Sequence, residues 1–414
     1  SGVIEMSFKS LYKLFVMNDS STFNSIYQEK FNSNSTIKFD IYINENQSFF
    51  YFDKEIMALV SNIRNLDYKI SEIFYDLPLI AIEQYKRKSL IDEIEFTNKI
   101  EGVISTRKDI NDLINEIEKK TKTRNRFEGI INKYLMLNKE KLFFKDSNDI
   151  RKLYDEMLYN EIKLEDEKNL PDGNIFRKEQ VHVIKTGDKI VHNGIMPESK
   201  IIEYMNKSLD ILNDPSIDML IRVSLFHYLF GYIHPFYDGN GRINRFISSY
   251  ILSKYLNNII GFRLSMTIKE NLSQYLDAFN YTNDIRNKAD ISTFVYEFLD
   301  IIYKSYQKTE IYALEKKQIL EKYKNILENV MDRFNDNKSK YSIKDLLFVL
   351  IQCSIFGDFG FTKSNLCEIV KKGNTKITEY LGIFKKLNLC IDIQSGKYHY
   401  YKANLEELDK YENK

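Results

Sequence analysis

The run of residues 217–233 constrains the fold most, because it is apolar on almost every side. A helix without a polar face is buried all round, so we expect this run to form the centre of a mainly α-helical core. Asp214 followed by Pro215 predicts the helix start, since Asp is a favoured N-cap residue and proline suits the first helical position. We expect the helix to end at His234, because Pro235 cannot continue it.

The segment that follows, residues 234–245, reads HPFYDGNGRINR and predicts a tight loop before a second helix. Gly239 and Gly241 flank Asn240, and glycine allows a backbone to approach a ligand closely. From Ile243 onward the apolar residues recur at helical spacing, so the loop lies at a helix N-terminus, where unpaired amides attract anions.

The polar side chains of this segment predict phosphate chemistry. Arg242 and Arg245 are three residues apart and can face the same way as cations for two phosphates. Asp238 offers a carboxylate to Mg²⁺, and His234, with an ordinary pKa near 6.5, suits a general base. Taken singly, each fragment is more typical of an ordinary turn. Together they suit an attack by a deprotonated hydroxyl on a phosphoryl group, with Asn240 donating to a phosphoryl oxygen.

The segment resembles the signature of the Fic family, H-P-F-x-[DE]-G-N-G-R-x-x-R, at every fixed position. The resemblance implies a Fic helical core and a protein adenylyltransferase, which moves AMP from ATP to a Ser, Thr or Tyr hydroxyl of a target protein and releases pyrophosphate. It implies that His234 is the base, that Asp238 holds Mg²⁺ on the α- and β-phosphates, and that Arg245 meets the γ-phosphate. The implied anion hole consists of Gly239, Asn240, Gly241 and Arg242. Gly241 favours adenylylation, because the kinase-like relative Doc has lysine there.

A second motif, Thr97-Asn98-Lys99-Ile100-Glu101-Gly102, ends a helix that we predict from Pro78 to the stop at Gly102. Taken alone, Glu101 is a surface acid at a helix C-terminus, a position that costs about 0.3 to 1 kcal/mol. The hexamer resembles the inhibitory motif [ST]-x-x-x-E-[GN] of Fic proteins with an N-terminal inhibitory helix. That resemblance implies that Glu101 pairs with Arg245 in the space of the γ-phosphate and that Thr97 helps to fix the helix. In some relatives this glutamate positions a water that removes AMP, so AMP removal is an alternative activity.

Residues 181–191 alternate around Thr186-Gly187-Asp188 and predict a β-hairpin. In Fic proteins a hairpin here, the flap, docks the target protein by strand pairing, so the resemblance implies a protein partner at this place. We assign His182 and His192 to the hairpin surface. His227, on the buried helix, is interpreted as a hydrogen-bonded core histidine.

Residues 275–283, YLDAFNYTN, resemble the family pattern Y-Y-x-x-L-x-x-x-N on the adenosine side of the site. The resemblance places Leu276 and Asn283 at the base and ribose, although leucine replaces the second tyrosine. An amphipathic helix with a core-facing stripe explains the same residues equally well.

The rest of the chain predicts three domains. These are residues 1–105, which end in the inhibitory helix; residues 106–306, the catalytic core; and residues 307–414, a connector helix and a winged helix-turn-helix. We expect a strand pair within residues 36–52 and three helices over residues 106–162. In the winged helix we expect helices from Thr362 to about residue 371 and from Thr375 to Lys386, followed by a hairpin turning at residues 394–397. This winged helix suits a homodimer or protein contact better than DNA binding, because its second helix carries no arginine.

The composition of the chain limits the kinds of partner that we expect it to bind. Net charge is +1, so there is no bulk attraction to nucleic acid or membrane. No twenty-residue apolar run or signal segment is present, which predicts a cytoplasmic protein. The three cysteines lack metal-ligand spacing and are interpreted as reduced core residues. Mg²⁺ and ATP are the expected cofactor and substrate, and a nucleotide-sensing regulator that binds DNA is the alternative from another class.

Overall fold

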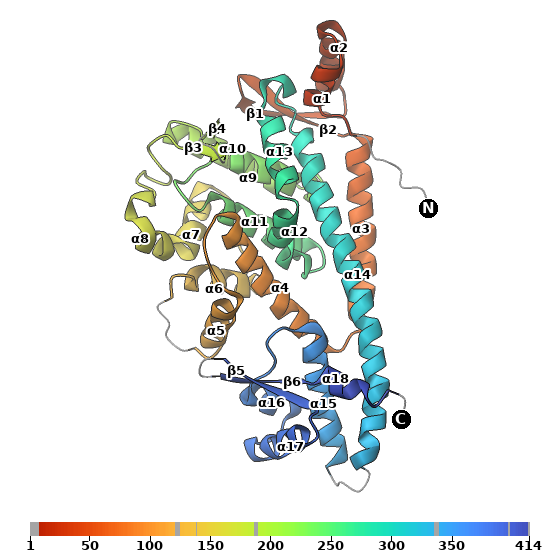
Figure 1. Cartoon of the computed structure of the whole chain (residues 1–414). Helices are drawn as coiled ribbons and strands as arrows, with labels where there is room; N and C mark the ends of the chain where they lie inside the picture. Colours follow the sequence, from red (N-terminus) through yellow and green to blue (C-terminus); the bar gives the residue numbers. More distant parts are fainter. Residues whose placement is uncertain are drawn as a thin grey trace. The chain divides into compact units, whose positions relative to one another are not determined.

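The computed structural model describes residues 8–120, 125–137, 139–185, 189–334, 339–395 and 398–412. The chain is mainly α-helical, as predicted, and its described strands form small two-stranded hairpins (Figure 1). Two compact units are present, one of residues 1–67 and 90–307 and one of residues 68–89 and 308–414. Helices α3 (Lys54–Tyr75), α4 (Leu79–Ile100) and α14 (Ser292–Met331) contribute to both units. The division into domains 1–105, 106–306 and 307–414 stays a prediction.

The first unit contains most of the remaining helices and two hairpins. In chain order they are α1 (Leu11–Met17), α2 (Ser20–Phe31), β1 (Thr36–Ile43), β2 (Asn46–Tyr51), α5 (Arg107–Glu118), α6 (Glu128–Met136), α7 (Ser147–Met157), α8 (Tyr159–Asp166), β3 (His182–Lys185), β4 (Lys189–Asn193), α9 (Glu198–Asn213), α10 (Met219–Ile233), α11 (Asn240–Tyr255), α12 (Leu264–Glu270) and α13 (Leu272–Asn283). Four helices, α5 to α8, replace the three expected over residues 106–162. The backbone of Leu158 (φ −125°, ψ −17°) departs from helical geometry and separates α7 from α8.

Helix α10 is buried along almost its whole length and forms the centre of this unit, as its apolar sequence predicts. Its start differs from the prediction. The side chain of Asp218, not Asp214, caps the helix by accepting a hydrogen bond from the Leu220 amide at 2.8 Å. Asp214 instead ends α9 and forms a turn through the Ser216 amide (2.9 Å), so Pro215 lies between two helices.

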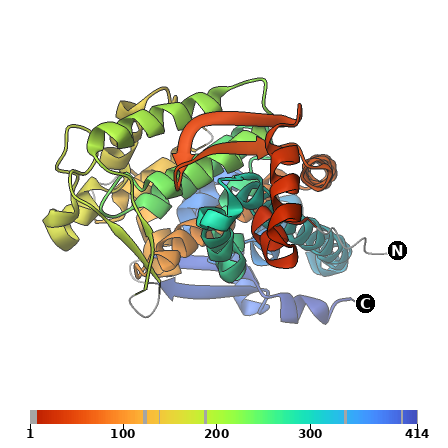
Figure 2. The same cartoon turned by 90° about the horizontal axis from the view of Figure 1, so that it is seen from above.

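The predicted strand pair within residues 36–52 is confirmed, with a turn at Asn44 and Glu45, which both have positive φ. Figure 2 shows this hairpin beside α9, where the Tyr42 amide donates to the Tyr204 hydroxyl at 3.2 Å. On the other side, Phe49 packs with Leu11 of α1 in a small apolar cluster.

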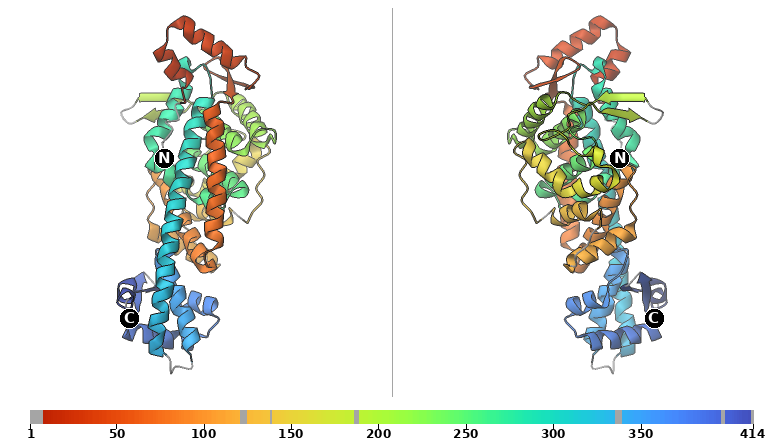
Figure 3. Two further views of the ribbon diagram at one scale, coloured as in Figure 1. Left: turned by 90° about the vertical axis from the view of Figure 1, so that its right-hand side faces the viewer. Right: turned by 90° about the vertical axis from the view of Figure 1, so that its left-hand side faces the viewer.

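Helix α14 is 40 residues long and runs beside α3 (Figure 3). Within the first unit, the Tyr306 hydroxyl donates to the Asp67 carboxylate at 2.8 Å. The lysine- and glutamate-rich segment of residues 308–334, expected as a connector, is thus mostly the second half of a helix that begins at Ser292.

The second unit ends in the predicted order of helices and hairpin: α15 (Lys340–Phe356), α16 (Lys363–Val370), α17 (Asn374–Lys386), β5 (Cys390–Ser395), β6 (Tyr398–Ala403) and α18 (Leu405–Asp409). The predicted turn at residues 394–397 lies partly outside the described residues. In α17, Lys376 pairs with Glu379 and Lys385 pairs with Asp392, so both lysines already have acidic partners. Cys353 and Cys390 are buried free thiols. Across the described residues, no helix has an apolar stretch long enough to cross a bilayer.

Candidate active site

The loop between α10 and α11 is held by its own backbone contacts. His234 ends α10 in the left-handed conformation (φ 54°, ψ 63°), and its amide donates to the Phe230 carbonyl at 3.0 Å. Gly239, at φ 82°, starts α11. The Asn240 side chain closes the loop, because it accepts from the Phe236 amide at 2.9 Å and donates to the Phe236 carbonyl at 2.8 Å. This bracing role of Asn240 was not predicted from the sequence.

Phe236 anchors the loop in the core. Its ring is fully buried and stacks on Tyr154 at a centroid distance of 4.1 Å. Since both the backbone and this aromatic contact are fixed, the amides at the start of α11 have a defined direction.

A pocket of about 340 Å³ opens beside this loop. It brings together seven of the predicted site residues, which are Glu101, His234, Asn240, Gly241, Arg245, Leu276 and Asn283. The other lining residues are Ile100, His192, Gly231, Asn244, Tyr275, Phe279 and Asn280. Four other predicted residues are not part of this lining: Thr97, Asp238, Gly239 and Arg242. Gly102, two residues after the end of α4, has φ 76°.

The imidazole of His234 is partly buried at the pocket wall. Burial, followed by the nearby His192 and Arg177, lowers its pKa to about 4, well below the 6.5 used in the sequence argument. The ring is therefore neutral at pH 7, which a proton acceptor requires, and is a weaker base than an exposed histidine.

Arg177 holds the backbone around His234. Its fully buried guanidinium donates to the carbonyls of His234 and Ile195 at 2.9 Å and of Glu179 at 2.7 Å. Burial lowers the pKa of Arg177 to about 10, so it is still a cation at pH 7. Because these bonds join the end of α10 to the segments on either side of the β3–β4 hairpin, Arg177 fixes where the His234 ring lies. The sequence argument missed it, since no acidic partner or motif marks it.

Arg245 is held by the end of α4. Its Nε donates to Thr97 Oγ1 at 2.9 Å, and its Nη2 donates to the Thr97 carbonyl at 3.0 Å and to Glu101 Oε1 at 2.7 Å. Arg245 and Thr97 are buried, whereas the Glu101 side chain is 26% exposed. The predicted inhibitory pair is thus present as a contact, with Thr97 bonded directly to the arginine.

The Glu101 carboxylate lies directly over the Gly241 backbone. A Cβ at Gly241 would overlap the carboxylate oxygen of Glu101 and lie 2.8 Å from Nη1 of Arg245. Burial alone would raise the pKa of Glu101, but Arg245, Arg242 and His234 outweigh it, and the pKa is lowered. A negative charge therefore occupies the space above the loop where a phosphate oxygen would meet the same groups.

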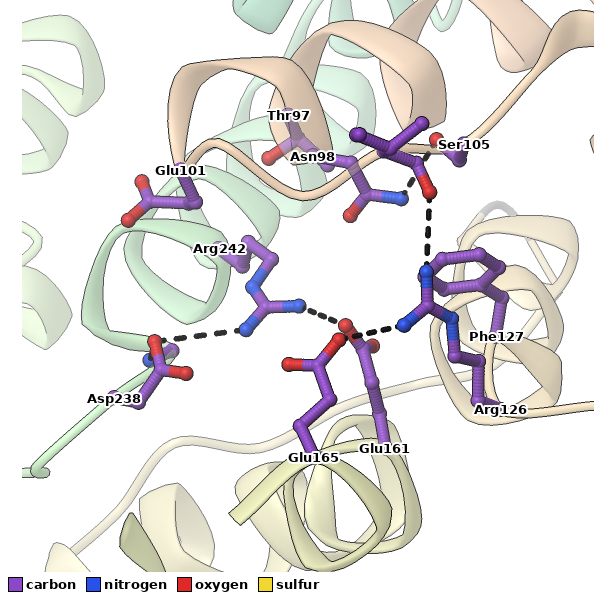
Figure 4. Close-up of polar contacts among 12 residues, drawn as sticks. Thr97, Asn98, Glu101, Ser105, Arg126, Phe127, Glu161, Glu165, Asp238 and Arg242 are labelled. Carbon is purple, nitrogen blue, oxygen red and sulfur yellow. Dashed lines mark hydrogen bonds and ion pairs between the residues drawn. The ribbon is translucent and has the colours of Figure 1, made fainter.

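Arg242 is not among the residues that line the pocket. Figure 4 shows it between Asp238 and Glu161. Its Nη1 lies 2.5 Å from Glu161 Oε1, and its Nη2 lies 3.6 Å from Asp238 Oδ1. Neither Arg242 nor Glu161 is exposed. Glu161 was not singled out in the sequence, because nothing near it marks it as different from other acids on α8.

Asp238 is the predicted Mg²⁺ ligand. Its side chain is 37% exposed, and Oδ1 accepts from the Gly239 amide at 2.5 Å. Among the described residues no group of three or more His, Cys, Asp or Glu side chains could hold a metal by itself. A single exposed carboxylate fits an ion that takes most of its ligands from phosphate and water, as Mg²⁺ does.

The far wall of the pocket is formed by α13. Leu276 is 43% exposed, and the Asn283 side chain accepts from the Tyr228 hydroxyl at 2.7 Å. Behind them, His227 is buried and contacts the hydroxyls of Ser248 (2.8 Å) and Tyr275 (2.7 Å). The interpretation of His227 as a core histidine is confirmed.

The two hairpin histidines differ. His182 is exposed beside Asn193, as assigned, but the assignment of His192 to the surface was wrong. The His192 ring packs on Tyr232, contacts its carbonyl at 2.6 Å and lines the pocket. It lies on β4 with a side chain that turns toward α10, a direction that alternation alone does not give. Strands β3 and β4 pair antiparallel, and the predicted turn at residues 186–188 lies outside the described residues.

One family model and several solved structures match the chain. The model of the Fic/DOC family matches residues 144–252, which span α7 to α11 and include the loop. Matching solved structures include a Fic family protein from Desulfovibrio desulfuricans G20, at 18% identity and a TM-score of 0.46, with 83% of this chain and 96% of that chain covered. Residues 134–508 of Fic-1 from C. elegans match at 18% identity and a TM-score of 0.42, covering 63% of this chain and 74% of that one.

A Fic domain-containing signaling protein from Bacteroides thetaiotaomicron matches at 18% identity and a TM-score of 0.40, covering 63% of this chain and 97% of that one. No curated protein matches the chain. The chain contains a Fic/DOC family domain at residues 144–252.

Proposed function

We propose that the protein is a protein adenylyltransferase that moves AMP from ATP to a Ser, Thr or Tyr hydroxyl of a target protein, and that Glu101 inhibits it. One observation carries the proposal: the Glu101 carboxylate is bound by Arg245 above the Gly241 backbone, in the same pocket as the neutral His234. A site that binds a carboxylate through a buried arginine at a helix N-terminus is suited to a phosphate.

The chemistry follows from these residues. His234 accepts the proton of the target hydroxyl as its oxygen attacks the α-phosphorus of ATP. The bond between the α-phosphorus and the bridging oxygen breaks, and pyrophosphate leaves. The Gly241 amide and Arg245 stabilise the charge on the phosphate oxygens, and the pocket keeps the reacting groups aligned.

Mg²⁺, held by Asp238 and by the phosphates, would neutralise charge on the α- and β-phosphates. Leu276 and Asn283, which line the same pocket, would contact the base and ribose of the nucleotide. The target would dock on the β3–β4 hairpin through backbone pairing, a mode that gives register without dependence on side chains.

Glu101 inhibits in this scheme by competition. While the Glu101 carboxylate occupies Arg245, the γ-phosphate has no cation to bind. ATP then binds in a pose whose α-phosphate is not in line with the target hydroxyl. The same carboxylate lies close enough to His234 to affect its pKa, which is where a water for AMP removal would be activated.

The test uses full-length Glu101→Gly with Mg²⁺ and ATP labelled at either the α- or the γ-phosphate. We expect label from the α-position to stay on the protein after denaturation, with release of pyrophosphate. Label retained only from the γ-position would instead indicate a kinase. Loss of AMP from an adenylylated sample incubated with wild type, but not with Glu101→Gly, would support AMP removal as the activity.

A further inference from the structure

Two rows of residues with the same spacing join α4 to α11. Each row consists of residues four apart, which share one face of a helix: Glu93, Thr97 and Glu101 in and just after α4, and Gly241, Arg245 and Ser249 on α11. The rows meet in antiparallel order. At one end Ser249 Oγ donates to Glu93 Oε1 at 3.3 Å, in the middle Arg245 bonds to Thr97, and at the other end the Glu101 carboxylate lies over Gly241. We call this set of contacts the α4–α11 interface.

Glu93 holds one end of the α4–α11 interface. Its fully buried carboxyl accepts from the Ser265 amide at 2.8 Å and from the Ser265 hydroxyl at 2.5 Å, in addition to Ser249. The Tyr134 hydroxyl lies 3.4 Å from the same carboxyl. Because these three partners belong to α12, α11 and α6, one side chain joins α4 to three other helices. Helix α4 is therefore held in place two turns before Glu101, by contacts in which Glu101 takes no part.

Thr97 holds Arg245 in the middle of the interface through two hydrogen bonds. Arg245 donates from Nε to Thr97 Oγ1 at 2.9 Å and from Nη2 to the Thr97 carbonyl at 3.0 Å. Both residues are buried, but Arg245 lines the pocket and Thr97 does not. A buried guanidinium needs acceptors for its donors, and Thr97 supplies two of them without the help of Glu101. The direction of Arg245 thus remains fixed when the Glu101 carboxylate is absent.

Glu101 is the residue of the interface that is free to leave it. Its side chain is 26% exposed, whereas Glu93 and Thr97 are fully buried. In the described part of the chain, its carboxylate has Arg245 as its hydrogen-bond partner and no other. Figure 4 shows Glu101 at the end of the helix that carries Thr97, and α4 itself stops one residue earlier. The Glu101 side chain can therefore turn into solvent while α4 keeps its contacts.

We propose that α4 stays in place in the active protein, and that Thr97 is a positioning residue, which holds Arg245 for a phosphate of the nucleotide once Glu101 has turned away. Thr97 touches no substrate and acts through Arg245. Relief of inhibition is then the movement of one side chain rather than the departure of a helix. The inference rests on the proposed function for the identity of the nucleotide. A helix that only inhibits predicts that loss of the Thr97 hydroxyl leaves nucleotide binding intact or improves it, whereas the proposal predicts a loss.

The first test measures binding rather than turnover. In full-length Glu101→Gly/His234→Ala, which is not expected to transfer AMP, the Kd values for ATP and ADP with Mg²⁺ are measured by calorimetry. Thr97→Val keeps the shape of the side chain but removes the acceptor for Nε of Arg245. We expect it to weaken ATP roughly tenfold, the worth of a hydrogen bond to a charged group, and to change ADP less than twofold, because ADP lacks the γ-phosphate. Thr97→Ser, which keeps the hydroxyl, should restore the affinity for ATP.

The cycle with Arg245→Ala shows whether Thr97 acts through Arg245. In that case, adding Thr97→Val to Arg245→Ala changes the ATP Kd less than twofold. An ATP Kd that Thr97→Val leaves unchanged, an equal loss for ATP and ADP, or an equal loss with and without Arg245 would each overturn the proposal. Thr267→Val is the matched control, because Thr267 is a buried threonine of α12 whose hydroxyl donates to the Arg263 carbonyl at 2.9 Å.

A second measurement stays informative if Thr97→Val does not fold. Hydrogen exchange of the backbone amides of residues 93–100 is compared between wild type and Glu101→Gly, each with ATP and Mg²⁺. We expect equal protection, because the contacts of Glu93 and Thr97 persist. Loss of protection across this segment in Glu101→Gly would show that α4 leaves α11, and would overturn the proposal. ATP binding without AMP transfer in Glu101→Gly would refute the proposed function and leave both measurements valid.

Discussion

The carboxylate of Glu101 and the guanidinium of Arg245 lie 2.7 Å apart, and the same Nη2 also donates to the Thr97 carbonyl. Arg245, near the start of α11, therefore binds the end of α4 at two points: the Thr97 backbone carbonyl and the Glu101 side chain. The cation also offsets the unfavourable position of an acid at a helix C-terminus. In the proposed function, both inhibition and catalysis depend on this one buried side chain.

Gly241→Ala tests the anion site directly. The new methyl group would overlap the position of the Glu101 carboxylate and lie 2.8 Å from Nη1 of Arg245. In the Glu101→Gly background, where the carboxylate is gone, we expect AMP transfer to fall by roughly 10²-fold, because the phosphate is displaced by about an ångström. Gly382→Ala on α17, where a Cβ meets nothing within 4 Å, is the control. Unchanged transfer in Gly241→Ala would mean that no phosphate approaches this amide.

The pH dependence of transfer should report the lowered pKa of His234. Its pKa of about 4 keeps the imidazole neutral, and able to accept a proton, down to that pH. Since the charge of Glu101 raises this pKa, the acid limb of kcat/KM in Glu101→Gly is expected at or below pH 4. An acid limb near pH 6.5 would contradict the assignment. His182→Gln, which alters an exposed histidine of the hairpin, should leave the profile unchanged.

Arg177→Lys is expected to lower kcat with little change in the KM for ATP. Lysine cannot span the carbonyls of His234, Ile195 and Glu179, so the imidazole loses its fixed position while the phosphate contacts persist. Misplacement of a base by about an ångström costs on the order of 10² in rate. Arg333→Lys, whose arginine lies over the ring of Tyr411 in the second unit, serves as the control. A rise in KM with kcat unchanged would show that Arg177 supports nucleotide binding instead.

Glu93 is predicted to make the stability of the first unit depend on pH. The carboxyl is fully buried and bonds to the Ser265 amide (2.8 Å) and to hydroxyls, and burial raises its pKa to about 7. Because the folded state binds this proton more tightly, stability is fully present below pH 4.5 and is lost as pH rises through 7.

Glu93→Gln should remove that loss. Relative to wild type, its free energy of unfolding is expected to increase by about 3 kcal/mol as pH rises from 4.5 to 8, and its Tm to rise with it. The comparison is made by thermal unfolding at several pH values. Glu165→Gln is the control, because the Glu165 side chain is 35% exposed and pairs with Arg126. A Tm difference that does not depend on pH would show that Glu93 is ionised in the folded state.

Much of the fold could be predicted because periodicity and turn residues act locally. The all-apolar character of α10, the stop at Gly102 and the hairpin within residues 36–52 each follow from a few neighbouring residues. Asp218 shows the limit of this reasoning. Both Asp214 and Asp218 are good caps, and in the structure Asp214 ends α9 whereas Asp218 caps α10.

The residues of the candidate site also fall into those that the sequence could predict and those that it could not. Residues 234–245 lie together in the sequence, so their shared loop could be predicted, whereas Arg177, Glu161 and His192 reach it from other elements. Their roles depend on tertiary contacts: carbonyls for Arg177, one nitrogen of Arg242 for Glu161, and the direction of a strand side chain for His192. Short-range patterns carry no information on such contacts.

The most direct test of the account is self-labelling with α-labelled ATP and Mg²⁺ in three full-length proteins: wild type, Glu101→Gly, and Glu101→Gly/His234→Ala. The account predicts weak labelling of wild type, strong labelling of Glu101→Gly, and none of the double variant, because the pocket is freed in the second and loses its base in the third. Equal labelling of wild type and Glu101→Gly, or labelling that persists without His234, would contradict it.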